Sequence, residues 1–254
     1  MKHIDSLKIS IITIVLNQEK TISKSIKSIV DQDYKRKELI VIDGCSEDNT
    51  INEINKYSSN INFFISVKDN GIYHALNRGI RLATGDIIGF VHGDDFLLSN
   101  TILSEISLNF SINKVDGIYG NLEYVKKHDS SSIVRSWISR PYYPEMIKKA
   151  WMPPHPTLFL RKEVYEKHGY FDTSFKISAD YEFIIRIFKD QYLKFEYLPK
   201  TITRMRLGGI SNGSFRNIAL KVKEDYRAMR KHKVGNIFTL ARKTLSKLDQ
   251  YFKS

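Results

Sequence analysis

This 254-residue sequence has one cysteine, no long apolar run and, toward the C-terminus, few acidic residues. The single cysteine, Cys45, excludes a disulfide within the chain and fits a reducing cytosol. No apolar run approaches the roughly 18 residues that a membrane-spanning helix needs. The N-terminal segment MKHIDSLKISIITIVLN contains Asp5 and no small-residue cleavage site, so we interpret it as leading into a strand and not as a signal peptide.

The shortage of acidic residues makes the end of the chain strongly basic. The whole sequence has 40 Lys and Arg against 28 Asp and Glu, a formal net charge of +12. Residues 201–254 hold 13 Lys and Arg against 3 Asp and Glu, so this segment supplies ten of the twelve excess charges. This distribution predicts contact with an anionic surface, which could be membrane headgroups, nucleic acid or a phosphorylated acceptor.

What the sequence does contain is a regular alternation of apolar strands and amphipathic helices over its first half. With 42% hydrophobic and 27% charged residues, its composition is typical of a globular protein with a substantial core. The pattern predicts strands at 9–16, 38–42, 61–67 and 87–91, and helices at 21–30, 50–57, 72–83 and 101–110. Such alternation is typical of an α/β fold with a mostly parallel central sheet flanked by helices.

Polar residues follow three of these strands directly. Asn17 follows the first, Asp43 ends the second, and His92-Gly93-Asp94-Asp95 follows the fourth. The carboxyl ends of parallel strands lie at one edge of a sheet, where α/β proteins bind ligands. Two adjacent carboxylates after a buried strand are costly without positive charge, and a divalent metal carrying a phosphate would supply it. A solvated Asp-Asp turn is the alternative explanation for this pair.

The pattern changes after residue 116, where strands and helices no longer alternate regularly. We predict antiparallel strands at 117–124 and 132–137, a rigid non-helical segment at 151–157, a helix opening near residue 178, strands at 158–160 and 195–198, and a flexible basic loop at 204–211. The remainder is expected to be helical in two pieces. In the second piece apolar residues recur at helical spacing, namely Ile237, Leu240, Ala241, Leu245, Leu248 and Phe252.

Several segments carry a resemblance to a known family through their order and spacing. They are VIDGCSEDNT, DNGIYHALNRGIRLATGD, FVHGDDFL, PHPTLFLRKEVYEKHGYFD and SADYEFIIR. Together they resemble glycosyltransferase family 2, the inverting enzymes with the nucleotide-diphospho-sugar-binding GT-A fold, and most of all its bacterial surface-polysaccharide members. The resemblance implies a GT-A domain at 1–211, with a nucleotide-binding half at about 1–115 and an acceptor-binding half at about 116–211, followed by a basic amphipathic helical extension at 212–254.

The resemblance assigns donor-binding and metal-binding roles to five residues. Asp43 would hydrogen-bond the nucleobase, expected to be uracil, in a pocket that Asn17 helps to line. Arg78 would face the diphosphate of the donor. Asp95, together with Asp94, would bind a divalent metal, Mn²⁺ or Mg²⁺.

Asp180 stands where the family has its catalytic base. An inverting transfer needs a carboxylate that takes the proton of the acceptor hydroxyl, and positive charge on the other side to stabilise the departing diphosphate. Considered by itself, an Asp at this place is more often a helix N-cap. Glu182 is the alternative carboxylate, although its spacing directs it elsewhere on the helix.

Four further residues are weaker candidates for binding the acceptor or the diphosphate. Trp151 could stack on a sugar ring, although a lone tryptophan more often packs in the core or at its rim. His155, between two prolines, could position a substrate or serve as a structural histidine. Arg204 and Arg206 could close over the diphosphate or belong to a solvated basic loop.

These features together predict an inverting, metal-dependent sugar transferase of bacterial O-antigen, capsule or exopolysaccharide synthesis. It would move a sugar from a UDP-linked donor to a lipid-linked oligosaccharide acceptor, forming a β-linkage from an α-linked donor. Residues 212–254 would bind an anionic membrane, so we expect a cytoplasmic protein, peripheral on the inner face of the cell membrane. The alternative is a non-catalytic nucleotide-sugar or polyanion-binding protein on the same fold. Nucleic acid is not an expected partner, because the sequence has no aromatic stacking surface or groove-reading motif.

Overall fold

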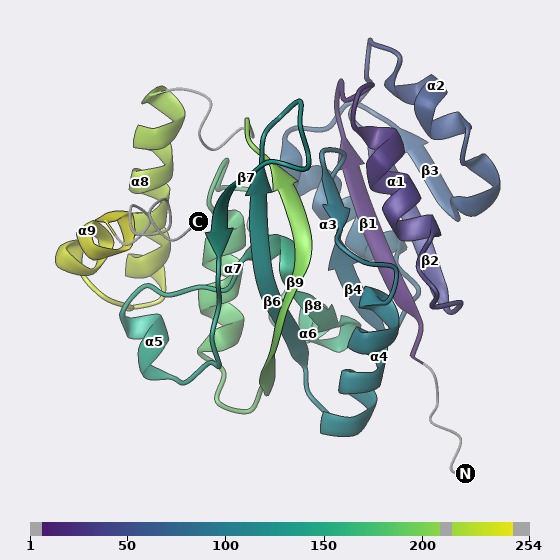
Figure 1. Cartoon of the computed structure of the whole chain (residues 1–254). Helices are drawn as coiled ribbons and strands as arrows, with labels where there is room; N and C mark the ends of the chain where they lie inside the picture. The colour runs from purple at the N-terminus through teal and green to yellow at the C-terminus, as the bar shows by residue number, and fades with distance from the viewer. Residues whose placement is uncertain (1–6, 209–214, 246–254) are drawn as a thin grey trace.

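The computed structural model describes residues 7–208 and 215–245, which are built around a mixed nine-stranded sheet. In this part of the chain the strand order is β3-β2-β1-β4-β8-β6-β9-β5, and β7 pairs with β6 outside that path (Figure 1). The parallel strands are β1 (Ile9–Val15), β2 (Lys37–Asp43), β3 (Phe63–Ser66) and β4 (Ile87–Phe90). All four confirm the strands that the sequence pattern predicts, to within two residues at each end.

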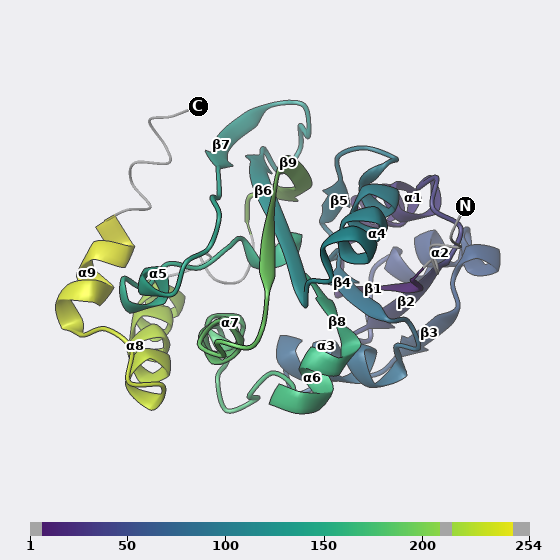
Figure 2. The same cartoon turned by 90° about the horizontal axis from the view of Figure 1, so that it is seen from below.

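Side chains of the parallel strands enter two apolar layers, one on each face of the sheet (Figure 2). The helices of this half are α1 (Ile22–Val30), α2 (Thr50–Asn55), α3 (Ile72–Leu82) and α4 (Ile102–Asn113). Ile9 and Ile11 pack in the layer of α1, α2 and α4, whereas Ile12 and Ile14 pack in the layer of α3. Because side chains alternate along a strand, β1 serves both layers and is buried over its whole length.

The second half of the chain completes the sheet with pairings that are mostly antiparallel. Its elements are β5 (Asp95–Leu97), β6 (Gly117–Val125), β7 (Ile133–Trp137), α5 (Glu145–Lys148), β8 (Phe159–Arg161), α6 (Lys162–His168), α7 (Ala179–Phe188) and β9 (Phe195–Arg206). Strand β6 lies antiparallel to β7 and β8 but parallel to β9. The predicted antiparallel pair around residues 126–129 is therefore confirmed.

Two predictions for this half are wrong. Residues 204–206 are not part of a flexible loop, because β9 continues to Arg206 and pairs with β6 on one side and β5 on the other. Segment 151–157 is not wholly non-helical, because its last three residues, His155–Thr157, form a 3-10 turn, although two prolines next to His155 exclude an α-helix. Strand β5 is short, begins with the acidic Asp95 and follows Asp94 directly, so the sequence pattern does not reveal it.

The two C-terminal helices predicted from the sequence are present and pack on the domain. They are α8 (Phe215–Lys231), which lies beside α7, and α9 (Ile237–Leu245), which lies beside α8 (Figures 1 and 2). Ala228, Met229, Val234 and Leu240 are buried in the same apolar cluster as α7. No helix of the described residues is long and apolar enough to cross a membrane. Residues 209–214 of the predicted loop and tail, and residues 246–254 with Leu248 and Phe252, lie outside the described residues.

Candidate active site

The carboxyl ends of β1, β2 and β4 meet at one edge of the sheet, as the parallel register requires. Two loops are tied together there. Asn17, which adopts a left-handed φ of 52°, donates its backbone N–H to the Ser46 hydroxyl at 2.8 Å. Its side-chain oxygen accepts the N–H of Glu47, also at 2.8 Å. The residue predicted to line the nucleobase pocket therefore joins the loop after β1 to the loop after β2.

Asp43 is buried at the end of β2 and its carboxylate is held by protein donors. The Ser46 N–H and hydroxyl donate to it at 3.0 and 2.5 Å, and the Ser66 hydroxyl donates at 2.6 Å. Ser66 ends the neighbouring strand β3, so these bonds orient the carboxylate across two loops. Contact of Asp43 with a nucleobase stays a prediction; Oδ1 accepts only one of these three bonds, which leaves it capacity for a ligand donor.

Asp94 lies in the turn between β4 and β5, and Asp95, which follows it, is the first residue of β5. Asp95 is 1% exposed, and neither of its carboxylate oxygens has a hydrogen-bond partner among the described residues. Burial and the adjacent charge of Asp94 raise the pKa of Asp95 well above its usual value, although Arg206 opposes the shift. Burial likewise raises the pKa of Asp94. An ionised carboxylate in such a place is strongly destabilising unless a cation from outside the chain binds it.

The donor set of this turn suits a hard divalent cation. Two neighbouring carboxylates, one with both oxygens free of protein partners, provide the oxygen ligands that Mg²⁺ and Mn²⁺ prefer. No group of three His, Cys, Asp or Glu side chains that could hold a metal occurs in the described residues. The protein would therefore share such a cation with ligand oxygens, as Mg²⁺ sites do with substrate phosphates.

A cavity of about 490 Å³ opens beside the same turn. Asn17, Asp94 and Arg206 line it, together with Lys20 and with Lys127 from the turn between β6 and β7. Arg206 also donates from Nη1 to the backbone oxygen of Asp94 at 2.7 Å, so β9 holds a guanidinium against the acidic turn. The lining also includes Glu19 and Asp48, so three cationic and three acidic side chains surround the cavity, and its cations can bind an anionic ligand such as a diphosphate.

The other predicted arginines already have acidic partners in the protein. Arg78 on α3 lies 3.0 Å from Asp69, with its side chain 40% exposed, and it does not line the 490 Å³ cavity. Arg204 donates to Glu123 at 2.7 Å across the β6–β9 pair. Arg206 is therefore the predicted arginine that the structure places beside the acidic turn.

Asp180 is the second residue of α7 and lies against α3. Its Oδ1 is 3.0 Å from the Tyr73 hydroxyl, which also lies 2.6 Å from the backbone oxygen of Ile177. Burial and the charge of Asp180 raise the pKa of Tyr73 well above its usual value, so Tyr73 stays protonated and can donate. The N-cap of α7 is Ser178, so the alternative role of Asp180 as the N-cap is wrong.

His155 lies between Asp180 and the acidic turn. It stacks on Phe90 at the end of β4, with ring centroids 5.4 Å apart, and meets the edge of Phe171 at 5.6 Å. Burial lowers the pKa of His155, although Asp180 opposes that shift. Phe90 also stacks on His92, so neutral rings connect the surroundings of Asp180 with the turn that carries Asp94 and Asp95.

Trp151 is packed against other aromatic rings. Its centroid lies 5.7 Å from Tyr119, 5.8 Å from Tyr142 and 6.0 Å from Phe188. These contacts match the rim-packing alternative, and they leave the half-buried indole a partial exposed surface. Stacking on a sugar ring stays a prediction for this residue.

Two residues near the predicted site were not singled out from the sequence. Tyr73, next to Asp180, lies within the segment that carries the family resemblance, so its place there was a usable signal. Lys127 enters the cavity because the β6–β7 turn folds over the α1 end of the sheet, where Lys24 contacts Ser130. Nothing in the sequence near Lys127 indicates that contact, because strand pairing across the whole sheet decides it.

Solved structures identify the class of fold to which this arrangement belongs. S. aureus TarS 1–349, in complex with UDP-GlcNAc, superposes with a TM-score of 0.69 at 19% identity, covering 89% of this chain and 65% of that one. The mannosyltransferase PcManGT from Pyrobaculum calidifontis, in complex with GDP-Man and Mn²⁺, gives 0.64 at 17% identity, covering 89% and 64%. At these identities the likeness establishes the fold alone, and it is the GT-A-like α/β fold that the sequence resemblance implies.

The sequence comparison identifies the family. The model of glycosyl transferase family 2 matches residues 10–169, which is more than half of the chain. The Escherichia coli UDP-Glc:alpha-D-GlcNAc-diphosphoundecaprenol beta-1,3-glucosyltransferase WfgD is 33% identical over 136 residues, 53% of this chain and 52% of WfgD. A PGL/p-HBAD biosynthesis glycosyltransferase of Mycobacterium bovis is 27% identical over 212 residues, 80% of this chain and 78% of that protein. The chain therefore belongs to glycosyl transferase family 2, and it spans about half the length of WfgD.

Proposed function

We propose that this protein is an inverting glycosyltransferase that takes a sugar from a nucleotide diphosphate donor. The observation that carries the proposal is the buried, unpartnered carboxylate of Asp95, set beside Asp94 and the Arg206 guanidinium at the ligand-binding edge of the sheet. Asp180 lies nearby, beyond the rings of Phe90 and His155. A diphosphate site and a separate carboxylate are the two parts that inverting transfer needs.

In this mechanism Asp180 accepts the proton of the acceptor hydroxyl while that oxygen attacks the anomeric carbon. The new glycosidic bond forms as the bond to the diphosphate oxygen breaks, and the nucleoside diphosphate leaves with the bonding electron pair. The Tyr73 hydroxyl lies 3.0 Å from Oδ1 of Asp180, and the other carboxylate oxygen would take the proton. A positioned base typically contributes about 10²–10⁴-fold in rate.

The departing diphosphate needs positive charge. Basic side chains beside the acidic turn supply part of it, and a metal ion held by the carboxylates would supply the rest. Arg206 and Lys127 line the cavity next to Asp94. Asp94 and Asp95 would hold Mn²⁺ or Mg²⁺, which when bound acts as a Lewis acid on the diphosphate. A non-catalytic binding protein would not need a carboxylate such as Asp180 to accept a proton.

The named relatives support a UDP-linked donor and a lipid-linked acceptor. WfgD is named for UDP-Glc and a diphosphoundecaprenol-linked acceptor, and TarS was solved with UDP-GlcNAc. PcManGT was solved with GDP-Man and Mn²⁺, so GDP-sugars are included in the test. We assign the protein to O-antigen, capsule or exopolysaccharide synthesis on this basis.

The outer face of α8 supports attachment to the inner face of the cell membrane. Its two acidic residues, Glu224 and Asp225, are both buried against the domain. The exposed side chains of α8 include the apolar Ile218, Val222 and Tyr226 and the basic Arg216, Lys223 and Arg230, whereas the exposed Arg227 donates to Ser174 of the domain. A face with this mixture can insert apolar groups among lipids while each near-surface cation contributes about 1 kcal/mol with anionic headgroups.

The transfer reaction is tested with a panel of UDP-, GDP- and dTDP-sugars, with Mn²⁺, Mg²⁺ or EDTA, and a lipid diphosphate carrying one sugar as acceptor. The variants are Asp95→Ala, Asp180→Asn and, as a matched control on an exposed loop, Asp33→Asn. We expect one donor class to react in a metal-dependent way. Asp180→Asn should lose about 10²–10⁴-fold in kcat while it still binds donor.

The outcomes separate the competing functions. Donor binding without hydrolysis or transfer, with and without acceptor, would favour the non-catalytic alternative. Full activity of Asp180→Asn would move the base to another carboxylate. Equal losses in Asp33→Asn and Asp180→Asn would mean that the change disturbs the protein generally.

Membrane binding is tested separately by sedimentation with vesicles of neutral or anionic phospholipid. The double variant Lys223→Glu/Arg230→Glu changes the outer face of α8, and the control Lys35→Glu/Arg36→Glu makes the same charge change before β2. We expect salt-sensitive binding to anionic vesicles that the α8 variant loses and the control keeps. Equal binding by both variants would contradict this attachment.

A further inference from the structure

The inner face of α8 makes a concentrated contact with the segment that leads into α7. The Glu224 carboxylate is 5% exposed and accepts three successive backbone N–H groups. Lys176 and Ile177 donate at 2.8 Å each, and Ser178 donates at 3.0 Å. Hydrogen bonds to an ionised acceptor are about twice as strong as neutral ones, so this single side chain fixes three consecutive peptide groups.

The clamped segment ends two residues before Asp180. Ser178 is the N-cap of α7, and Asp180 is the second residue of that helix. Ile177 is held from both sides, because Glu224 accepts its N–H and the Tyr73 hydroxyl lies 2.6 Å from its carbonyl oxygen. The same hydroxyl contacts Asp180 Oδ1, so α8 and α3 jointly define where that carboxylate lies.

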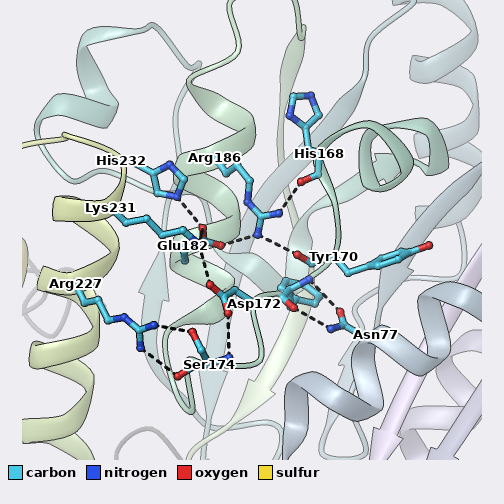
Figure 3. A network of polar contacts seen from close by, with 11 residues as sticks. Asn77, His168, Tyr170, Asp172, Ser174, Glu182, Arg186, Arg227, Lys231 and His232 are labelled. Atoms are coloured by element: carbon cyan, nitrogen blue, oxygen red, sulfur yellow. Dashed lines mark hydrogen bonds and ion pairs between the residues drawn. The ribbon is translucent and has the colours of Figure 1, made fainter.

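Other side chains of the same helical turn also point to the C-terminal helices. The Lys243 ammonium lies 2.9 Å from the centre of the Tyr181 ring. Glu182 contacts Lys231 at 2.9 Å and His232 at 2.7 Å, and Arg186 on α7 itself at 2.6 Å (Figure 3). The contacts of Asp180 run the other way, toward α3, so the turn is anchored behind the proposed base.

We infer that Glu224 is a positioning residue for Asp180, acting through the 176–178 backbone from a helix outside the domain boundary that the sequence predicts. This inference rests on the proposed function, because it assigns Glu224 to the reaction in which Asp180 is the base. A displacement of about 1 Å in a catalytic group costs up to about 10²-fold in rate. Loosening the clamp therefore lowers kcat without removing any group that binds donor.

The test compares Glu224→Gln with Glu166→Gln, which makes the same change on the exposed side of α6. Glutamine keeps the size of the side chain but loses the charge, and its NH₂ group would face backbone N–H groups from which it cannot accept a hydrogen bond. We expect Glu224→Gln to reduce kcat per donor-binding site by about 10- to 100-fold, with the KM for donor changed less than twofold. The control should match the wild type in both.

Hydrogen exchange provides a second measurement that does not depend on activity. The amides of residues 176–178 donate directly to Glu224, so they should exchange faster in Glu224→Gln, while amides of β1 keep their protection. Unchanged exchange at 176–178 would overturn the clamp. Faster exchange with an unchanged kcat per binding site would overturn the positioning role.

The two levels of the argument can fail separately. A wild-type protein that transfers and hydrolyses no donor would overturn the proposed function, whatever the exchange data show. A wild-type protein that is active, with Glu224→Gln equally active per donor-binding site, would leave the proposed function standing and overturn the inference. The rate is divided by the number of donor-binding sites, so a partly misfolded sample of the variant does not lower the measured kcat.

Discussion

Two of the regions that contain buried carboxylates have opposite surroundings. At the contact between α7 and α8, Glu182 is fully buried and bonded to His232, Lys231 and Arg186 (Figure 3). Burial alone would raise its pKa, but these bonds outweigh it and lower the pKa to about 2. At the turn between β4 and β5, Asp95 is as deeply buried but has no hydrogen-bond partner among the described residues, and its pKa is raised.

This difference distinguishes buried carboxylates that stabilise the fold from the carboxylate of Asp95, which we propose binds a cation. A protein stabilises a buried carboxylate by providing cations and donors, as it does for Glu182 and for Asp225 beside Lys243 and Lys221. Leaving Asp95 without such partners costs stability in the free protein. That cost is offset when a cation from outside binds there, which is why we place the function at this turn.

The largest expected effect on stability comes from removing the paired carboxylate. Glu182→Ala leaves Arg186 and Lys231 beside an empty buried position, and breaking a buried ion pair costs about 3–5 kcal/mol. Urea unfolding at pH 7 measures the change. Glu166→Ala on the exposed face of α6 is the control and should cost under about 0.5 kcal/mol. A cost for Glu182→Ala near that of the control would erase the distinction between the two regions.

Removing the unpaired carboxylate should have the opposite sign. Asp95→Asn discharges a buried group that no described residue bonds, so the metal-free protein should gain about 1–3 kcal/mol in stability. Sugar transfer should fall by about 10²–10³-fold, and the stabilisation that Mn²⁺ gives to the wild type in thermal unfolding should disappear. A loss of stability in Asp95→Asn would show that the turn is a structural element like the α7–α8 contact.

A pH series sharpens the same comparison. The pKa of Glu182 is about 2 in the folded protein and 4.5 as its ordinary value, so folding favours the ionised form. Its contribution to stability is therefore fully present above about pH 4.5 and is lost as the pH falls toward 2. We expect the stability difference between wild type and Glu182→Gln to narrow over this range. A difference that is constant from pH 7 to pH 3 would mean that the ion pairs do not account for it.

The smallest effect is expected where a pair is exposed to water. Lys56 contacts Glu53 at 2.5 Å on α2, but its side chain is 60% exposed. Lys56→Ala should change the free energy of unfolding by less than about 0.5 kcal/mol, because solvent screens such pairs. A larger effect in urea unfolding at ordinary salt would indicate that pairing alone, without burial, stabilises this protein.

Much of the nucleotide half could be predicted because its signals are local. The apolar run at Ile87–Phe90 and the acidic residues that follow it predict a buried strand ending at a cation site, and the strand lies there. Helices α1 and α3 follow from apolar residues at helical spacing. The parallel order of these strands then brings the ends of β1, β2 and β4 together, as the sequence predicted.

The less regular half was harder to predict because its structure depends on distant partners. The sequence predicts that Arg206 lies in a basic loop. Strand β9 instead continues to Arg206, because it pairs with β6 on one side and with β5 on the other. Glu224 reads as one acidic residue in a basic helix, and only the packing of α8 on α7 brings it to three backbone N–H groups. Pairings between residues so far apart leave no periodic signal in the chain.

By itself, then, the amino-acid sequence determined the fold class and the edge of the sheet where acidic and amide side chains gather, because apolar periodicity and chain order encode these features, and the order and spacing of its motifs indicated the family. The tertiary structure decided which of those acids are bonded by the protein and which have no hydrogen-bond partner among the described residues. It also decided that the basic C-terminal helix turns its two acids inward, against the turn that carries Asp180. These outcomes depend on burial and on donors from remote segments, and burial is a property of the packed molecule.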